Sequence, residues 1–367
     1  RASLLQILCS ARSERQLMEQ LDDNLLFRWF VGLGIDDAVW VPTVFSRNRD
    51  RLLTSDMSRK VMAFVGETVP RTVFRSSSFL AHREVAPLLS DDHFSVDGTL
   101  VKAWASMKSL RPKEDGRPPK DGDPGDPPAQ DAAPQDPSPQ PGPEPRPMAR
   151  PASRSRNAEV NFKGEKRSNT THASTTDPEA RLYRKSPGTG AMLCFMGHAV
   201  MEMRRVPPPV RGTRRLRSGL AVQGELTQAC GRAERKAALD MMHRQSPGST
   251  RRLTPGAELP AIAPPVRATA GDTHDVAGFA ADCRRACIAP HVAQKARFSA
   301  IGRRTTRHEG HALSQRPRKR IEELFGWSKT VGGAAQAVYR GVERLRSRFI
   351  LALAAANLAR LPRLLAI

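Results

Sequence analysis

The chain has 367 residues, of which 59 are Lys or Arg and 37 are Asp or Glu, so its formal net charge at pH 7 is +22. Solubility alone does not require such an excess, and nucleic acid is the polyanionic partner that we expect. Hydrophobic residues make up 39% and aromatic residues 5%, which indicates that part of the chain is disordered. Five scattered cysteines, an odd number, argue against a disulfide-stabilised fold.

No segment of the chain is predicted to be a secretory signal or to cross a membrane. The apolar stretch 2–9 is short and is soon followed by charged residues. The longest apolar run, 349–358, is interrupted by Asn357 and closed by Arg360, so it is too short for a bilayer. We therefore expect a cytoplasmic protein with no membrane partner.

Residues 1–90 are predicted to form a helical N-terminal domain. Ser13 precedes apolar residues that share one helical face, namely Leu17, Leu21, Leu25, Leu26 and Trp29. Thr43 is expected to cap a second helix over 44–53, which displays Arg47, Asn48 and Arg49. Two helices of this kind suit the major groove of DNA, so these three side chains are candidate DNA contacts. A solvated helix face is the alternative interpretation.

Residues 91–110 are expected to carry the first strand of a second domain. The segment 93–100 is predicted to be a short strand. Asp97, followed by Gly98, is placed at the end of this strand, where its carboxylate could bind a hard cation, although Asp-Gly pairs are most often turns. Residues 111–155 are so rich in Pro, Asp and Gly that they are predicted to be a disordered linker.

Residues 156–367 alternate strand and helix patterns, which predicts an α/β core. Strands are expected over 191–201, 219–227, 251–257 and 288–292, and helices over 232–243, 276–287, 314–329 and 333–361. In the basic helix 314–329, helical spacing places Arg318, Glu322 and Lys329 on one face. A carboxylate between two cations can bind a metal while the cations bind phosphate, although the spacing alone favours a salt-bridged surface helix.

Several blocks resemble one family of proteins. They include SERQLMEQLDDNLLFRWFVGLGIDDAVW from Ser13, HFSVDGTLVKAWASMKSLRPK from His93, THASTTDPEARLYRK from Thr171, GELTQACGRAERKAALDMM from Gly224, and SQRPRKRIEELFGWSKTVGG from Ser314. In this order the chain resembles the bacterial insertion-sequence DDE transposases, in particular the insertion-sequence-five-like group with an InsH-like N-terminal domain. The resemblance covers well over half of the chain.

The resemblance implies a ribonuclease-H-like catalytic core in which three carboxylates bind two Mg²⁺ ions, with Mn²⁺ able to substitute. One ion would activate water or a 3′-hydroxyl, and the other would stabilise the leaving oxygen of a phosphodiester. Asp97 matches the first family carboxylate and Glu322 the third, since Arg318, Glu322 and Lys329 meet the family's Arg–Glu–Lys spacing. Gln315 stands where the family often has Tyr.

The second carboxylate has two candidates. Aligned from the N-terminal side, the family's Asp falls on Glu258, and aligned from the C-terminal side it falls near Asp272. Between them lies an unexpected, Pro-containing insert over 259–271. Asp272 is the preferred choice, with Glu258 as the alternative.

The expected function is that of a bacterial, nucleoid-associated transposase. Such an enzyme binds the terminal inverted repeats of its element and catalyses metal-dependent strand cleavage and strand transfer into target DNA, as a homo-oligomer in the active complex. The segments 65–83, 204–217 and 259–271 break the family pattern and suggest a degenerate copy. A catalytically dead, DNA-binding relic is therefore the alternative function.

Overall fold

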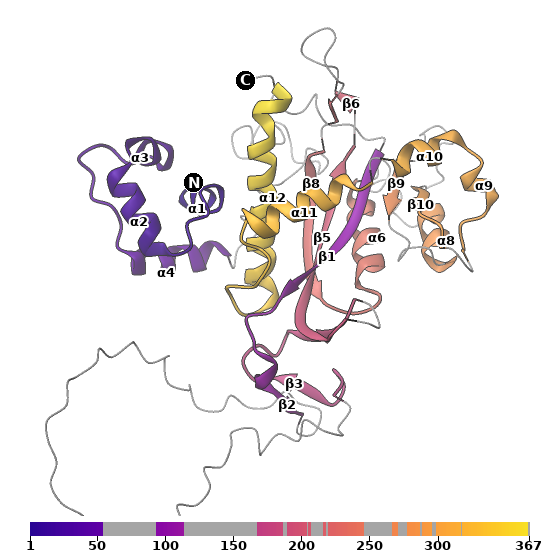
Figure 1. Cartoon of the computed structure of the whole chain (residues 1–367), viewed down its shortest axis with the longest axis horizontal. Coiled ribbons are helices and arrows are strands. Elements are labelled where there is room, and N and C mark those ends of the chain that lie inside the picture. Colours follow the sequence, from indigo (N-terminus) through magenta and orange to yellow (C-terminus); the bar gives the residue numbers. More distant parts are fainter. Residues whose placement is uncertain are drawn as a thin grey trace, which may run out of the picture.

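A computed structural model describes residues 1–53, 93–113, 167–185, 189–203, 205–206, 216–217, 219–245, 266–270, 277–286, 288–295, 299–316 and 318–365. These residues form a mixed α/β structure (Figure 1). The predicted strand 251–257, Glu258, Asp272 and nearly all of the predicted linker lie outside the described residues. Among the described helices, none is long and apolar enough to cross a membrane.

The N-terminal part consists of α1 (Ala2–Leu8), α2 (Glu14–Asp23), α3 (Leu25–Val31) and α4 (Pro42–Leu53). Ser13 caps α2 as predicted, because its hydroxyl accepts the backbone N–H of Gln16 at 3.1 Å. Asn24 caps α3 by accepting from Leu26 and Phe27. The helix predicted to continue through Trp29 is therefore two helices.

This break changes which apolar residues are buried. Leu17 and Leu21 lie in the N-terminal core, as the shared helical face predicts, whereas Leu25, Leu26 and Trp29 are 62%, 65% and 72% exposed. Their assignment to the same buried face was wrong, because the Asn24 cap reorients the chain. The predicted Thr43 cap was also wrong, since α4 already begins at the preceding proline, which suits the first position of a helix.

The central sheet runs in the order β10 (Ile288–Val292), β9 (Val266–Ala270), β1 (His93–Lys102) and β5 (Met192–Glu202). Along its other edge, β5 pairs directly with two strands. Its residues 192–194 pair with β4 (Arg181–Tyr183), and its residues 195–201 pair with β8 (Ala221–Gln228). β1 is antiparallel to β5 and parallel to β9, which is parallel to β10. The strands predicted for β1, β5, β8 and β10 are confirmed within one or two residues.

β9 lies inside the stretch predicted to be an insert. Its Val-Arg-Ala-Thr-Ala sequence pairs with β1 on one side and with β10 on the other. Residues 266–270 of this stretch are therefore part of the central sheet. The family pattern alone could not identify this strand, because a parallel strand is defined by distant partners and this one is only five residues long.

Helices cover both faces of the sheet. α12 (Val342–Leu365) packs on one face, where Phe349 and Leu353 contact the core that contains Phe195 of β5. α6 (Ala233–Gln245) and α8 (Ala277–Arg285) pack on the other face, in a core that contains Phe94 and Val200. Figure 1 shows α12 between the N-terminal helices and the strands, and it contacts both α1 and α4.

Two short strand pairs and three further helices complete the described structure. β2 (Leu110–Pro112) pairs with β3 (His172–Ser174) after a 3-10 turn at Met107–Ser109, and β6 (Arg205–Val206) pairs with β7 (Leu216–Arg217). The predicted linker boundary at 110/111 thus falls within β2. α9 (Arg303–Thr306), α10 (Glu309–Gln315) and α11 (Arg320–Thr330) precede α12. The helix predicted over 314–329 was wrong in extent, because residues 316–319 separate α10 from α11, and the helix predicted from 333 begins only at Val342.

Candidate active site

Asp97 lies in the middle of β1, where it pairs with β5 and is two residues beyond the part of β1 that pairs with β9. Ala199 of β5 is its registered partner, and two residues earlier Ser95 is paired with Thr269 of β9. One carboxylate oxygen, Oδ1, accepts the backbone N–H of Gly98 at 2.8 Å. The prediction that Asp97 ends its strand was wrong, because β1 continues to Lys102 through its pairing with β5.

The surroundings of Asp97 contain charges of both signs. Burial raises the pKa of Asp97 from 3.8 to about 6, the hydrogen bond from Gly98 opposes this shift, and the nearby carboxylate of Glu234 adds to it. The positive charges of Arg318 and Lys185 favour the ionised form. The charges that act on Asp97 thus come from distant parts of the sequence.

The predicted Arg–Glu–Lys set is only partly brought together. Arg318 lies in the turn before α11, where its carbonyl accepts the N–H of Ile321 at 3.3 Å, and its charge acts on Asp97. Lys329 is half-buried, and both burial and the charge of Lys185 lower its pKa. Glu322 is exposed on α11. The prediction that Arg318 shares a helical face with Glu322 and Lys329 was therefore wrong, because Arg318 precedes the helix.

The metal-ligating role of the predicted carboxylates stays a prediction. Within the ranges that the structure describes, no three His, Cys, Asp or Glu side chains form a group able to hold a metal ion. Asp272 and Glu258 lie outside those ranges, so the complete predicted set is not represented.

The sequence did not indicate two of the charges that act on Asp97, those of Glu234 and Lys185. Both lie in blocks that resemble the family, GRAERKAALDMM and THASTTDPEARLYRK, but no spacing rule connects either residue to Asp97. The sequence gives only a weak indication of Glu234, because an acidic residue is favourable in the first turn of any helix, whether or not it has a role in a site. Only the folding of β4 and α6 against β5 brings the two charges to β1.

The chemistry of the site fits a hard divalent cation. Asp97 offers carboxylate oxygens, the donor type that Mg²⁺ and Mn²⁺ prefer. Glu234 fills the space beside Gly98 on the α6 face of β1, and successive residues of a strand point to opposite faces, so Glu234 does not share the position of the Asp97 carboxylate. A cation at Asp97 would favour the ionised form of this carboxyl, whose pKa burial raises.

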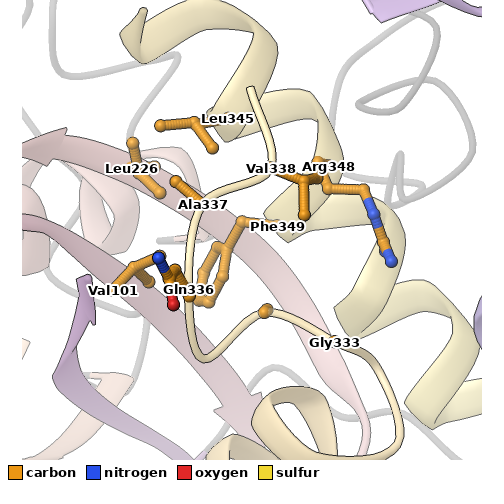
Figure 2. A pocket seen from close by; sticks show the side chains of 10 residues that line it. Val101, Leu226, Gly333, Gln336, Ala337, Val338, Leu345, Arg348 and Phe349 are labelled. Carbon is orange, nitrogen blue, oxygen red and sulfur yellow. The ribbon is translucent and has the colours of Figure 1, made fainter. Parts of the chain in front are cut away.

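A small pocket under the loop before α12 is not part of this site (Figure 2). Its lining includes Val101, Leu226 and Phe349, and it is apolar apart from Gln336 and Arg348. The Arg348 guanidinium points away from the other labelled side chains in Figure 2. The pocket therefore offers neither the carboxylates nor the convergent polar groups of a catalytic centre.

The three candidate DNA contacts on α4 differ in their surroundings. Arg47 and Asn48 are exposed, and the Asn48 side chain donates to the Val44 carbonyl at 3.1 Å. Arg49 instead bonds Glu14 and lies over the Tyr339 ring, 5.0 Å from its centroid. Arg49 thus connects α4 with α2 and with the loop before α12.

Two parts of the chain match family models. Residues 1–51, which contain α1 to α3 and nearly all of α4, match the transposase domain DUF772. Residues 279–362, which contain Arg318, Glu322 and Lys329, match the transposase DDE domain. No curated protein and no solved structure gives a significant match to the chain. The two matches, one toward each end of the chain, support its identification as an insertion-sequence DDE transposase.

Proposed function

We propose that this protein cuts DNA at the ends of an insertion sequence and joins those ends to target DNA, with Asp97, Asp272 and Glu322 as the catalytic carboxylates. The observation that carries this proposal is the position of Asp97 on β1, two residues beyond the last residue of that strand that pairs with β9. β9 ends at Ala270, two residues before Asp272 in the sequence, whereas Glu258 precedes the strand by eight residues. This order supports Asp272 over Glu258.

The sheet supports a ribonuclease-H-like core. β5 pairs antiparallel with both β1 and β8, and α6 follows β8 in the chain. β9 and β10 then return on the other side of β1 and run parallel to it. In this arrangement β1 is a central strand, so a carboxylate on β1 and groups that follow β9 are brought to one region of the sheet.

The described residues would hold and orient the DNA around Asp97. When bound, two Mg²⁺ or Mn²⁺ ions would activate the attacking oxygen and stabilise the leaving oxygen. Arg318 and Lys185, whose charges act on Asp97, and Lys329 beside them, would hold the phosphates. Burial removes part of the water around the Lys329 ammonium group. A bound phosphate would take the place of that water, so a half-buried ammonium group such as Lys329 is especially suited to a phosphate.

The N-terminal helices are proposed to bind the terminal repeats. Arg47 and Asn48 are exposed on α4 and are the side chains that we assign to DNA contact. Arg49 is engaged with Glu14 and Tyr339, so we assign it to the attachment of α4 rather than to DNA. Formation of a homo-oligomer in the active complex remains part of the proposal.

A cleavage assay tests the proposed activity. Labelled DNA that carries the ends of the element is incubated with the protein and Mg²⁺ or Mn²⁺, and the products are resolved on denaturing gels. The wild type is compared with Asp97→Asn and with Glu343→Gln, a change in an exposed carboxylate on α12. We expect nicking that requires the metal, is lost in Asp97→Asn and persists in Glu343→Gln.

The same assay separates the active enzyme from a relic. Specific, salt-sensitive binding to the ends without metal-dependent nicking, equal in the wild type and Asp97→Asn, would identify a catalytically dead DNA-binding protein. Nicking that does not depend on Asp97 would contradict the proposed site. Sizing of the protein–DNA complex by light scattering tests the homo-oligomer, which a single copy per complex would contradict.

A further inference from the structure

One side of the N-terminal helices exposes large apolar side chains. Helical spacing places Leu25, Leu26 and Trp29 of α3 in one exposed stripe, while the other side of this helix packs against the N-terminal core. Ile35, in the loop after α3, is 78% exposed. We call these four side chains the α3 patch. Apolar side chains gathered at a surface mark a site of contact with another macromolecule.

The Arg28 side chain holds the loop that carries Ile35 against α3. Arg28 is buried, and its Nη2 donates to the Gly34 carbonyl at 2.8 Å and to the Ile35 carbonyl at 2.9 Å. Arg28 lies one helical turn after Leu25, so these bonds place the loop beside the exposed stripe. The α3 patch is therefore a single surface with a defined structure.

Acidic residues border the α3 patch. Residues 16–46 contain one basic residue, the buried Arg28, in a chain whose formal net charge is +22. The same segment contains five acidic residues, all of them exposed: Glu19, Asp22, Asp23, Asp36 and Asp37. Such a border repels the phosphates of DNA, so the α3 patch suits a protein surface that carries positive charge.

A second exposed apolar surface lies at the end of β1. Trp104 lies between two alanines that are buried in the core, so its ring is directed outward and is 52% exposed. The N–H of the first alanine, Ala103, donates to the Leu193 carbonyl at 2.9 Å, which brings the exposed Met192 close to this loop. Met107, in the 3-10 turn that follows, is also exposed. We call Trp104, Met107 and Met192 the Trp104 patch.

Basic residues border the Trp104 patch. Residues 98–113 contain no acidic residue and four basic ones, Lys102, Lys108, Arg111 and Lys113. The first three are exposed, and Lys113 donates to the Asn169 carbonyl at 2.6 Å. The two patches are thus both apolar, and their borders carry opposite charge. This complementarity favours contact between them.

The two patches of one copy lie in different parts of the molecule. α1 and α4 contact α12, which places the N-terminal helices beside that helix. Figure 1 shows α3 on the outer side of these helices, far from β2, the strand that follows the Trp104 patch in the chain. A contact between an α3 patch and a Trp104 patch therefore requires two copies of the chain.

We propose that copies of this chain associate through these two surfaces, with the α3 patch of one copy docked on the Trp104 patch of another. A contact between two different surfaces either repeats from copy to copy or closes when the copies return the same contact to each other. The inference goes beyond the homo-oligomer proposed above, because it assigns the contact to two surfaces and requires neither DNA nor metal.

Self-association of the full chain without DNA tests this inference. The mass of the particles is measured by analytical ultracentrifugation over a range of protein concentrations. The variants are Trp29→Ser in the α3 patch and Trp104→Ser in the Trp104 patch. Val338→Ser is the control, since Val338 is 51% exposed and belongs to neither patch. A patch variant whose thermal unfolding midpoint falls is replaced by Leu26→Ser or Met107→Ser, which change the same two patches.

We expect each patch variant alone to weaken self-association about tenfold or more, because Trp side chains contribute much of the binding energy of protein contacts. Val338→Ser should associate as the wild type does. An equimolar mixture of Trp29→Ser and Trp104→Ser should form complexes of two copies, because the first keeps its Trp104 patch and the second keeps its α3 patch. Raising the salt concentration from about 0.1 M to about 1 M should weaken association of the wild type.

Three results would overturn the inference. They are a wild type that stays a single copy, patch variants that associate as the wild type does, and patch variants that do not recover association on mixing. The last result would indicate a contact between identical surfaces. Wild-type association that does not weaken with salt would overturn the pairing of the charged borders.

The outcome is distinguishable from that of the proposed function. Metal-dependent nicking by a protein that stays a single copy in solution would overturn the contact between the patches and leave the proposed DNA chemistry intact. Recovery of association on mixing, in a protein that does not nick DNA, would support the contact and contradict the proposed activity.

Discussion

The side-chain amide of Asn357 on α12 hydrogen-bonds both backbone groups of Ala221, the first residue of β8. Nδ2 donates to the Ala221 carbonyl at 2.7 Å, and Oδ1 accepts the Ala221 N–H at 2.8 Å. Asn357 is 1% exposed. Ala221 lies where the pairing of β5 with β8 shifts register, so the side chain of a helix satisfies backbone groups at this irregular end of the strand.

Replacing Asn357 with Leu should destabilise the protein by about 2–4 kcal/mol, because the variant leaves a buried N–H and a buried carbonyl without partners. The midpoint of urea unfolding measures the change. Asn48→Ala, on the exposed surface of α4, is the control and should shift the midpoint little. A loss below about 1 kcal/mol would mean that other groups satisfy Ala221 in the variant.

Gly224 of β8 should not tolerate alanine. Its Cβ would lie 2.6 Å from Leu353 Cδ1 and 3.2 Å from Ile350 Cγ1, both on α12. We expect Gly224→Ala to lose about 1–3 kcal/mol, the usual cost of overpacking. Gly231→Ala is the matched control, because no atom lies within 4 Å of its Cβ position. Equal unfolding midpoints for the two variants would contradict the close approach of α12 to β8.

Glu179 should stabilise the start of α12 from a distant part of the chain. Its Oε2 accepts the backbone N–H of Val342, the first residue of the helix, at 2.8 Å. Glu179→Ala is expected to lose about 0.5–1 kcal/mol, as other N-terminal caps do, and to increase amide hydrogen exchange in the first turn of α12. Glu19→Ala, exposed on α2, should change neither, and unchanged exchange in Glu179→Ala would argue against a capping role.

Asp97 should destabilise the metal-free protein at neutral pH. Its folded pKa, about 6, lies above the ordinary value of 3.8, so its stabilising contribution is complete below pH 3.8 and is lost as the pH rises through 6. This difference corresponds to about 3 kcal/mol. In a chelator, Asp97→Asn should match the wild type near pH 4 and exceed its unfolding free energy near pH 7.5. A pH-independent difference between the two would contradict the raised pKa.

The buried thiols should react only after unfolding. Burial raises the pKa of Cys194 to about 11 and that of Cys283 to about 12, whereas Cys9 and Cys230 are exposed. Alkylation at pH 8, followed by mass spectrometry of peptides, should label Cys9 and Cys230 in the native protein, because alkylation requires an accessible thiolate. Cys194 and Cys283 should be labelled only in denaturant. Native labelling of Cys194 would mean that β5 opens readily.

Local patterns in the sequence were sufficient to locate several elements. The strands β1, β5, β8 and β10 and the helices α2, α6 and α8 lie where the strand and helix patterns predict them. The Ser13 cap was also predictable, because a cap acts over a few residues. Asp97 could be selected for the same kind of reason, since the block around it resembles a family motif.

The sequence by itself determined the positive charge, most of the strands and helices near the site, and the family resemblance that the two family matches support. Only the tertiary structure decided that β9 lies beside β1, that Glu234 fills the space at Gly98, and that Arg49 turns inward to Glu14. The physical reason is the distance along the chain over which each interaction acts. Periodicity and capping act between residues that are close in the chain, whereas strand pairing, side-chain contact and charge interactions act between residues that are close in space.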